Sequence, residues 1–505
     1  MKEFLLDFYG YFIFFYSISL IISYITLMSL SFFSHRASKL FFDVPYVKQM
    51  LTGSPYTPGI SIVAPAYNEE RTIIDNVHSL LALDYPKYEV IIVNDGSTDS
   101  TLEKMIKQFD LVEVPFAYRE KVKSRPVHRL FKSTNDLYQQ LTIVDKENGG
   151  TKADASNAGI NVVQYPYYVC TDVDCILEKT ALYRIIWPVL NNHTRVIAVS
   201  ATMVMTNGCT VKEGKIVRVK APRTLIPLFQ NLEYMRSYLV GKTGWSAINA
   251  MPNVSGGFGL FDTEIAIAVG GYDSSSFAED MDMVIRMVTY MCDSGRQYKI
   301  VQIPKTCCWT EGPSNLFILN RQRTRWGRGL LQYFSIHHKV LFNAKYRQMG
   351  LITLPYLLLF EFAAPIIEAT GFFVFLWLVL TDAVNWDTMW IIFFMIYGFC
   401  QFLTIVICFF DYYIGSFYQR SFREYLLLIL ASLFEPFIYH PFVTFFSIKG
   451  YFSFLTTRNF KWGEMTRKGF KGGDQSEEQK EEVLNVSARY IPENREQERK
   501  EEDLV

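Results

Sequence analysis

Two apolar regions limit what this sequence can fold into. Residues 11–33 contain no charged side chain and are long enough to cross a bilayer as a helix. A second apolar region extends from about residue 351 to residue 455. The first stretch is too long for a cleaved signal peptide, and no small-residue cleavage site follows it. We therefore expect a membrane protein in which residues 1–33 form an N-terminal transmembrane helix.

The charges beside these regions predict an orientation in the membrane. The basic sequence HRASKL follows the first span, and Lys and Arg gather on the cytoplasmic side of spans. Residues 34–329 are then a cytoplasmic domain, and residues 330–345, which are amphipathic with basic flanks, form an interfacial helix. Residues 456–505 end in a polar, mostly acidic stretch, so we expect a cytoplasmic segment with a disordered tail.

The apolar region 351–455 also contains carboxylates and prolines. We expect two spans followed by a re-entrant or kinked hairpin, because Glu435 and Pro436 interrupt the last apolar stretch. Glu361 and Glu368 lie within the first of the two spans. Carboxylates at membrane depth face a protein interior or a polar cavity. These two either line a polar path through the membrane or make hydrogen bonds that pack helices together.

Between residues 60 and 174, short apolar runs alternate with stretches of helical periodicity. Strands are expected at residues 60–64, in YEVIIVND and in YYVCTDVD, each followed or preceded by a helix. This alternation predicts an α/β domain with a parallel sheet covered by helices. Residues 112–147 do not fit the rhythm, and we interpret them as an insertion at the edge where the strands end, with a strand near residues 140–144.

Polar residues follow three of the expected strands. Asn68 and Glu69, then Asp95, then Asp172 and Asp174 each come just after a strand. Ligands bind beyond the carboxyl ends of the strands in such sheets, so these groups predict a binding site. Two carboxylates separated by one residue suit a hard divalent cation, Mg²⁺ or Mn²⁺, bound together with a diphosphate.

Two further clusters offer groups of the same kind. Lys152 follows a glycine pair and precedes a helix, where it is either a contact to an anionic ligand or an ordinary surface lysine. Glu279 and Asp280 open an apolar-periodic helix. They either complement the helix dipole or provide a general base that takes a proton from a hydroxyl group.

The stretch NRQRTRWGRG, residues 320–329, lies just ahead of the second apolar region. Its arginines alone would be explained as a positive anchor on the cytoplasmic side. An anchor does not explain why Gln322, Arg325 and Trp326 occur together. A planar guanidinium suits a phosphate group, and an indole offers a flat face for packing.

Taken together and in order, these motifs resemble those of a known family. APAYNEE, VNDGS, GGTKADASNAG, TDVD, AED and QRTRW occur in the order seen in family 2 glycosyltransferases with membrane spans. The sequence resembles the cellulose, chitin, hyaluronan and poly-N-acetylglucosamine synthases over residues 60–330 and into the spans. The resemblance implies a GT-A-type, Rossmann-like glycosyltransferase domain inserted between transmembrane helices.

The resemblance also assigns roles on the donor side. It implies that Tyr67 and Glu69, with Asp95, hold the uridine part of a UDP-sugar. Lys152 and Asp172 would contact the diphosphate and sugar. Asp174 would hold the metal ion, Mg²⁺ or Mn²⁺.

On the acceptor side the family pattern T-E-D is here Ala278-Glu279-Asp280, so its first residue is changed. The resemblance implies that Asp280 is the catalytic base and that Arg325 binds the pyrophosphate of the leaving group. Gln322, Trp326 and Glu279 would bind the acceptor. The sequence TEGP, residues 310–313, resembles the mobile loop that closes over the nucleotide in such enzymes.

The function implied is inverting transfer from a UDP-sugar, UDP-N-acetylglucosamine or UDP-glucose, onto a growing β-linked polysaccharide that is exported across the membrane. The expected partners are the donor, a polysaccharide or glycolipid acceptor and the lipid bilayer, with no nucleic acid. Two alternatives remain open. One is a non-processive glycosyltransferase that makes a glycolipid, and the other is a membrane protein that senses nucleotide-sugars.

Overall fold

The structure is a computed structural model, and it describes residues 2–41, 44–115, 119–212, 215–414 and 420–456. The predictions made for residues 457–505, including the acidic tail, lie outside the described residues. The described residues belong to one compact unit, Met1–Thr466.

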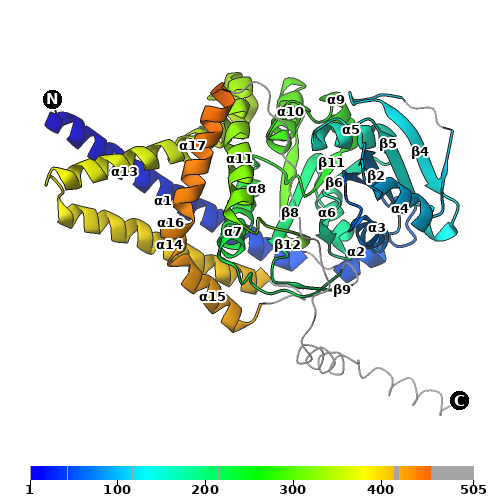
Figure 1. Cartoon of the computed structure of the whole chain (residues 1–505), viewed down its shortest axis with the longest axis horizontal. Helices are drawn as coiled ribbons and strands as arrows, with labels where there is room; N and C mark the ends of the chain where they lie inside the picture. The colour runs from blue at the N-terminus through cyan, green and yellow to red at the C-terminus, as the bar shows by residue number, and fades with distance from the viewer. Residues whose placement is uncertain (1, 42–43, 116–118, 213–214, 415–419, 457–505) are drawn as a thin grey trace, which may run out of the picture. The chain divides into compact units, whose positions relative to one another are not determined.

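A mixed sheet of ten strands organises the globular part, in the order β3-β4-β5-β2-β1-β6-β11-β8-β12-β7 (Figure 1). Strands β5, β2, β1 and β6 run parallel, whereas β11 pairs antiparallel with both β6 and β8. A two-stranded sheet of β9 and β10 accompanies it. The strands are β1 (Ile60–Ala66), β2 (Tyr88–Asp95), β3 (Leu111–Glu113), β4 (Val127–Ser133), β5 (Leu141–Lys146), β6 (Tyr167–Thr171), β7 (Ile176–Leu177), β8 (Val196–Met205), β9 (Thr210–Lys212), β10 (Lys215–Arg218), β11 (Phe258–Asp262) and β12 (Lys299–Thr310).

The expected parallel sheet is therefore confirmed for its first half only. Residues 112–147, interpreted as an insertion, contribute β4 and β5 to the sheet, and β5 matches the strand expected near 140–144. Strand β4 lies antiparallel to β5, and several of its side chains are exposed, as is common near the edge of a sheet.

Helices cover both faces of the sheet, and each face has its own apolar core. The helices of the globular part are α2 (Val44–Leu51), α3 (Ile73–Leu81), α4 (Thr101–Gln108), η1 (Asp136–Tyr138), α5 (Lys152–Val162), α6 (Ala181–Leu190), α7 (Leu225–Met235), the π-helix η2 (Arg236–Lys242), α8 (Thr243–Ala247), α9 (Thr263–Ala268), α10 (Glu279–Asp293) and α11 (Leu316–His337). The short turns η3 (His338–Val340) and η4 (Ala344–Tyr346) follow α11.

Helix α5 packs closely on β1 and β2. It begins where the hydroxyl of Thr151 accepts a hydrogen bond from the backbone N–H of Asp154. Gly159 lies at the contact, and a Cβ atom there would be 2.4 Å from a methyl carbon of Val63. The glycine therefore lets the helix approach the sheet and brings Lys152, the first helical residue, to the end of the strands.

Three described helices are long and apolar enough to cross a membrane: Tyr9–Arg36 within α1 (Lys2–Phe41), Met349–Leu380, and Trp386–Ile414, which is α14. The second comprises η5 (Met349–Thr353), α12 (Leu354–Leu357), η6 (Leu358–Phe362) and α13 (Ala364–Leu380). Helices α15 (Phe422–Ser432), α16 (Glu435–Ile438) and α17 (His440–Thr456) follow. The stretches Phe422–Ser432 and Glu435–Thr456 are bent by 44° at the break expected from Glu435 and Pro436, as a broken span or a re-entrant loop.

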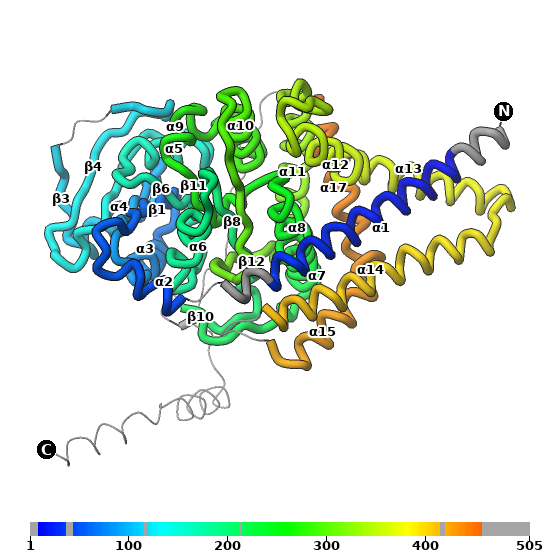
Figure 2. The backbone as a smooth tube through the Cα atoms, turned by 180° about the vertical axis from the view of Figure 1, so that it is seen from behind, coloured from blue at the N-terminus to red at the C-terminus, as the bar shows by residue number. Residues whose placement is uncertain are grey.

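Side-chain contacts join these helices to each other and to the globular part. Glu368 accepts hydrogen bonds from His440 at 3.0 Å and Thr444 at 2.7 Å, which matches the helix-packing alternative for this carboxylate. Helix α1 packs along α8 and η2, and Figure 2 shows this side of the molecule. There His35 Nε2 lies 2.9 Å from the carbonyl oxygen of Leu239.

Helix α11 packs along α17 (Figure 1). It runs without interruption from Leu316 to His337, so residues 330–337 continue this helix instead of starting a separate interfacial one. Its first turn is capped by Asn315, whose side chain accepts a hydrogen bond from the backbone N–H of Ile318. One rigid helix thus carries the whole stretch NRQRTRWGRG.

Candidate active site

The polar residues expected at the strand ends do follow neighbouring strands. Strands β2, β1 and β6 are adjacent and parallel. Asp95 is the last residue of β2, Glu69 comes three residues after β1, and Asp172 comes directly after β6. Parallel strands end at the same edge, so these groups share one edge of the sheet.

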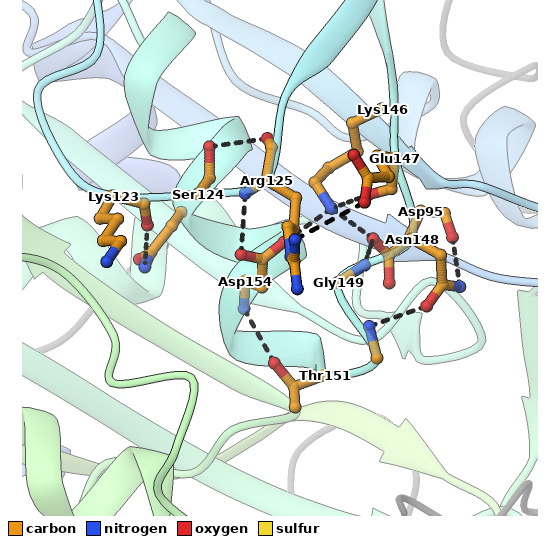
Figure 3. A network of polar contacts seen from close by, with 12 residues as sticks. Asp95, Lys123, Ser124, Arg125, Lys146, Glu147, Asn148, Gly149, Thr151 and Asp154 are labelled. Carbon is orange, nitrogen blue, oxygen red and sulfur yellow. Dashed lines mark hydrogen bonds and ion pairs between the residues drawn. The ribbon is translucent and has the colours of Figure 1, made fainter.

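Asp95 is buried and belongs to a dense polar network, shown in Figure 3. Its Oδ1 atom lies 2.5 Å from Nζ of Lys146 and accepts the backbone N–H of Gly149 at 3.0 Å. Lys146 also pairs with Asp154 at 2.6 Å. Sequence reasoning missed Lys146, although a lysine at the end of an otherwise buried strand was a signal that could have identified it.

Tyr67 and Glu69 lie in the turn after β1. The Tyr67 side chain is exposed, whereas Glu69 accepts a hydrogen bond from Thr72 at 2.8 Å and donates its backbone N–H to Thr101 at 2.9 Å. Asn68 adopts a left-handed conformation, with φ of 54°, and accepts the backbone N–H of Thr98 at 2.9 Å. The turn is therefore held to the start of α4 and leaves the Tyr67 ring open to a ligand.

The next group joins α5 to the end of β6. Lys152 Nζ lies 2.6 Å from Oδ1 of Asp172 and donates to the carbonyl oxygen of Gly256 at 2.5 Å. Burial opposes the charge on Lys152, but the Asp172 carboxylate more than offsets this and raises the pKa of Lys152 above its usual value. Asp172, Asp174 and Cys175 each offer a ligand atom within 4.8 Å of the others. Sequence reasoning missed Cys175, which has no signal beyond its place beside Asp174.

The expected acidic pair opens α10, as predicted from its periodicity. Asp280 accepts a hydrogen bond from the side chain of Asn253 at 3.0 Å. Burial raises the pKa of Glu279; Asp280 acts in the same direction, and the positive charges of Arg325 and Lys152 oppose it. Glu279 therefore lies within electrostatic range of both the sheet edge and α11.

Two of the residues singled out in the sequence, Gln322 and Trp326, have defined contacts on α11. Gln322 accepts a hydrogen bond from Gln230 at 2.8 Å. The Trp326 ring is covered on one face by the guanidinium of Arg323, 4.4 Å from the ring centroid. Arg323 was not predicted. It is buried and pairs with Glu233 of α7 at 2.7 Å.

Arg323 also connects this helix to the second apolar region, because it donates to the hydroxyl of Tyr439 at 2.8 Å. Arg236 makes a similar link through two hydrogen bonds to Glu435, at 2.9 and 2.6 Å. These bonds link α11 and η2 to Glu435 of α16 and to Tyr439, which lies between α16 and α17. The TEGP sequence starts at the last residue of β12, and Gly312 donates its backbone N–H to Asn207 at 2.7 Å.

Two family models match this chain. A family model described as Glycosyl transferase family 2 matches residues 61–211, and one described as Glycosyl transferase family group 2 matches residues 213–406. The chain belongs to the family 2 glycosyltransferases. Its mixed sheet with helices on both faces is the GT-A-type fold that the resemblance implied.

Curated relatives cover part of this glycosyltransferase. The poly-beta-1,6-N-acetyl-D-glucosamine synthase of Staphylococcus aureus is 28% identical over 306 residues, 60% of each chain. The synthase of the same name from Staphylococcus epidermidis is 27% identical over 292 residues, 57% of this chain and 58% of that one. The chain therefore spans about 60% of the length of these relatives.

Among solved structures, the mannosyltransferase PcManGT from Pyrobaculum calidifontis, in complex with GDP-Man and Mn²⁺, superposes with a TM-score of 0.48 and 18% identity. The match covers 86% of this chain and all of the mannosyltransferase.

Proposed function

We propose that this glycosyltransferase moves a sugar from a UDP-sugar, UDP-N-acetylglucosamine or UDP-glucose, onto a growing β-linked polysaccharide and passes the product across the membrane. The similarity to poly-N-acetylglucosamine synthases, over 60% of each chain, favours N-acetylglucosamine. The observation that carries the proposal is the meeting of two clusters. Lys152 pairs with Asp172 on the sheet side and donates to the carbonyl oxygen of Gly256, while Asn253, three residues before Gly256, donates to the carboxylate of Asp280.

On the donor side, Tyr67, Glu69 and Asp95 hold the uridine. The exposed Tyr67 ring offers a flat face to the base, and Asp95 is fixed in place at the end of β2. Lys152 and Asp172 take the diphosphate and sugar. The oxygen atoms of Asp172 and Asp174 are the hard ligands that Mg²⁺ or Mn²⁺ prefers, and such an ion, when bound, offsets charge on the diphosphate.

On the acceptor side, Asp280 takes the proton of the acceptor hydroxyl group, and the oxygen attacks the anomeric carbon of the α-linked donor from the opposite face. The bond between that carbon and the diphosphate oxygen breaks, UDP leaves, and a β-linkage results. Arg325 stabilises the charge that develops on the leaving diphosphate. Trp326 and Gln322 hold the acceptor sugar beside Glu279.

We also propose a multi-pass protein of the cell membrane with its glycosyltransferase domain in the cytoplasm. The basic residues after the first span support this orientation. The bend of 44° after Ser432 is compatible with a re-entrant hairpin that returns the chain to the cytoplasm. A reporter fused at the C-terminus should then read as cytoplasmic, and an external signal would refute the hairpin.

The function is tested by measuring UDP release from the purified full-length protein in detergent. A panel of UDP-sugars is supplied with Mg²⁺ or Mn²⁺, and products are sized on a gel. Release with one donor together with a long product is the expected result. Short lipid-linked products alone would favour a glycolipid enzyme, and no release with any donor would refute the transferase proposal for the isolated chain.

A further inference from the structure

A buried lysine outside the proposed mechanism lies beside the donor cluster. Lys146 ends β5, and its side chain is completely shielded from solvent. Its ammonium group reaches between two buried carboxylates, 2.5 Å from Asp95 and 2.6 Å from Asp154 (Figure 3). A buried cation is costly to desolvate, so this arrangement is stable only because both partners are in direct contact with it.

The same cluster holds the segment of residues 147–151. Asn148 donates its side-chain N–H to the backbone oxygen of Asp95 at 2.7 Å, and Gly149 donates its backbone N–H to the Asp95 carboxylate at 3.0 Å. A Cβ atom on Gly149 would lie 2.0 Å from Oδ2 of Asp154, which shows how closely the segment packs on the carboxylates.

This segment leads directly into α5, whose first residue is Lys152. Lys152 in turn contacts Asp172 at 2.6 Å. We propose that Lys146 is a positioning residue for the donor site: it holds the Asp95 carboxylate in place against the nucleoside. The inference rests on the proposed function, because it assumes that Asp95 contacts the nucleoside of the donor.

Removing the cation should affect the two ends of the donor unequally. Without Lys146, Asp95 and Asp154 are two buried carboxylates with no cation between them, so they repel each other. The repulsion displaces the Asp95 carboxylate. Lys152 and Asp172 keep their own ion pair, because it does not include Lys146. Nucleoside recognition should therefore weaken more than diphosphate binding.

The test uses Lys146→Met in the full-length protein in detergent, with dissociation constants for UDP and for inorganic pyrophosphate measured by calorimetry in Mg²⁺. We expect UDP affinity to fall by about tenfold or more, since Asp95 loses the cation that fixes its carboxylate and can no longer make its full hydrogen bond to the nucleoside, and pyrophosphate affinity to change much less. Lys123→Met is the matched control. Lys123 is an exposed lysine near the same network. It joins the network through its backbone carbonyl oxygen, which accepts a hydrogen bond from the side chain of Asn157.

Equal losses for UDP and pyrophosphate would overturn the inference, because they would indicate general damage. Unchanged UDP affinity would overturn it as well. If Lys146→Met does not stay monodisperse, Lys146→Gln is measured in its place with the same expectation. If the wild-type protein binds neither UDP nor pyrophosphate, both the proposed function and this inference are overturned. If the wild-type protein binds UDP and the Lys146 variant binds it equally well, only this inference is overturned.

Discussion

Gly450 on α17 should not tolerate even a methyl group. A Cβ atom there would lie 2.5 Å from the carbonyl oxygen of Thr324 and 2.8 Å from the backbone nitrogen of Arg328, both on α11. The reverse contact is equally close, because a Cβ on Gly327 would lie 2.5 Å from the carbonyl oxygen of Ser447. All these neighbours are backbone atoms, so no side chain can rotate away. Gly450→Ala must therefore push the two helices apart.

The expected size of the effect follows from these distances. An ordinary contact needs roughly 3.5 Å, so the helices must separate by about 1 Å at this point. Overpacking of this kind costs about 1–3 kcal/mol, while alanine regains about 1 kcal/mol of helix propensity over glycine. The net loss of stability is then up to about 2 kcal/mol. Arg325 and Trp326 lie on the displaced turn, and a shift of about 1 Å in positioning groups can cost about 100-fold in rate.

Sugar transfer and thermal unfolding in detergent would both be measured for Gly450→Ala. Gly398→Ala is the control, since Gly398 lies within α14 and a Cβ there would meet nothing within 4 Å. We expect the control to be neutral or slightly more stable. A Gly450→Ala protein with wild-type unfolding temperature and wild-type transfer rate would refute the argument that α11 and α17 are in fixed contact.

Three further predictions concern single side chains. Asp280→Asn should lower transfer by about 100-fold or more while the dissociation constant of UDP stays the same; an active variant would rule out the base role. Asp174→Asn should raise the Mn²⁺ concentration for half-maximal transfer by about tenfold or more, and an unchanged metal titration would contradict its role as a ligand. Burial lowers the pKa of Lys242 to about 8, so between about pH 8 and 10 the unfolded chain binds more protons than the folded protein and stability rises with pH. Lys242→Met should abolish this rise and be more stable at pH 7 by up to about 3 kcal/mol, as unfolding temperatures across that pH range would show.

The sequence was informative where a pattern is local. The strand ending at Asp95 and the helix opening at Glu279 follow from periodicity, and both are present in the structure. Pairing between distant segments has no such signal, so the antiparallel position of β11 between β6 and β8 was not predicted. The partners of Lys146 and Arg323 could not be predicted for the same reason. Each owes its place to partners on other elements, Asp154 in one case and Glu233 in the other.

The packing of α1 has a consequence for how the protein is made. This span is synthesised before the globular part that follows it, yet His35 contacts the backbone of Leu239, 204 residues later in the chain. At about 5–20 residues per second, the ribosome needs roughly 10–40 s to supply that partner. During this interval the first span must persist in the bilayer without its native neighbours. The order of synthesis thus sets a waiting time before the globular part can dock on the helix that anchors it.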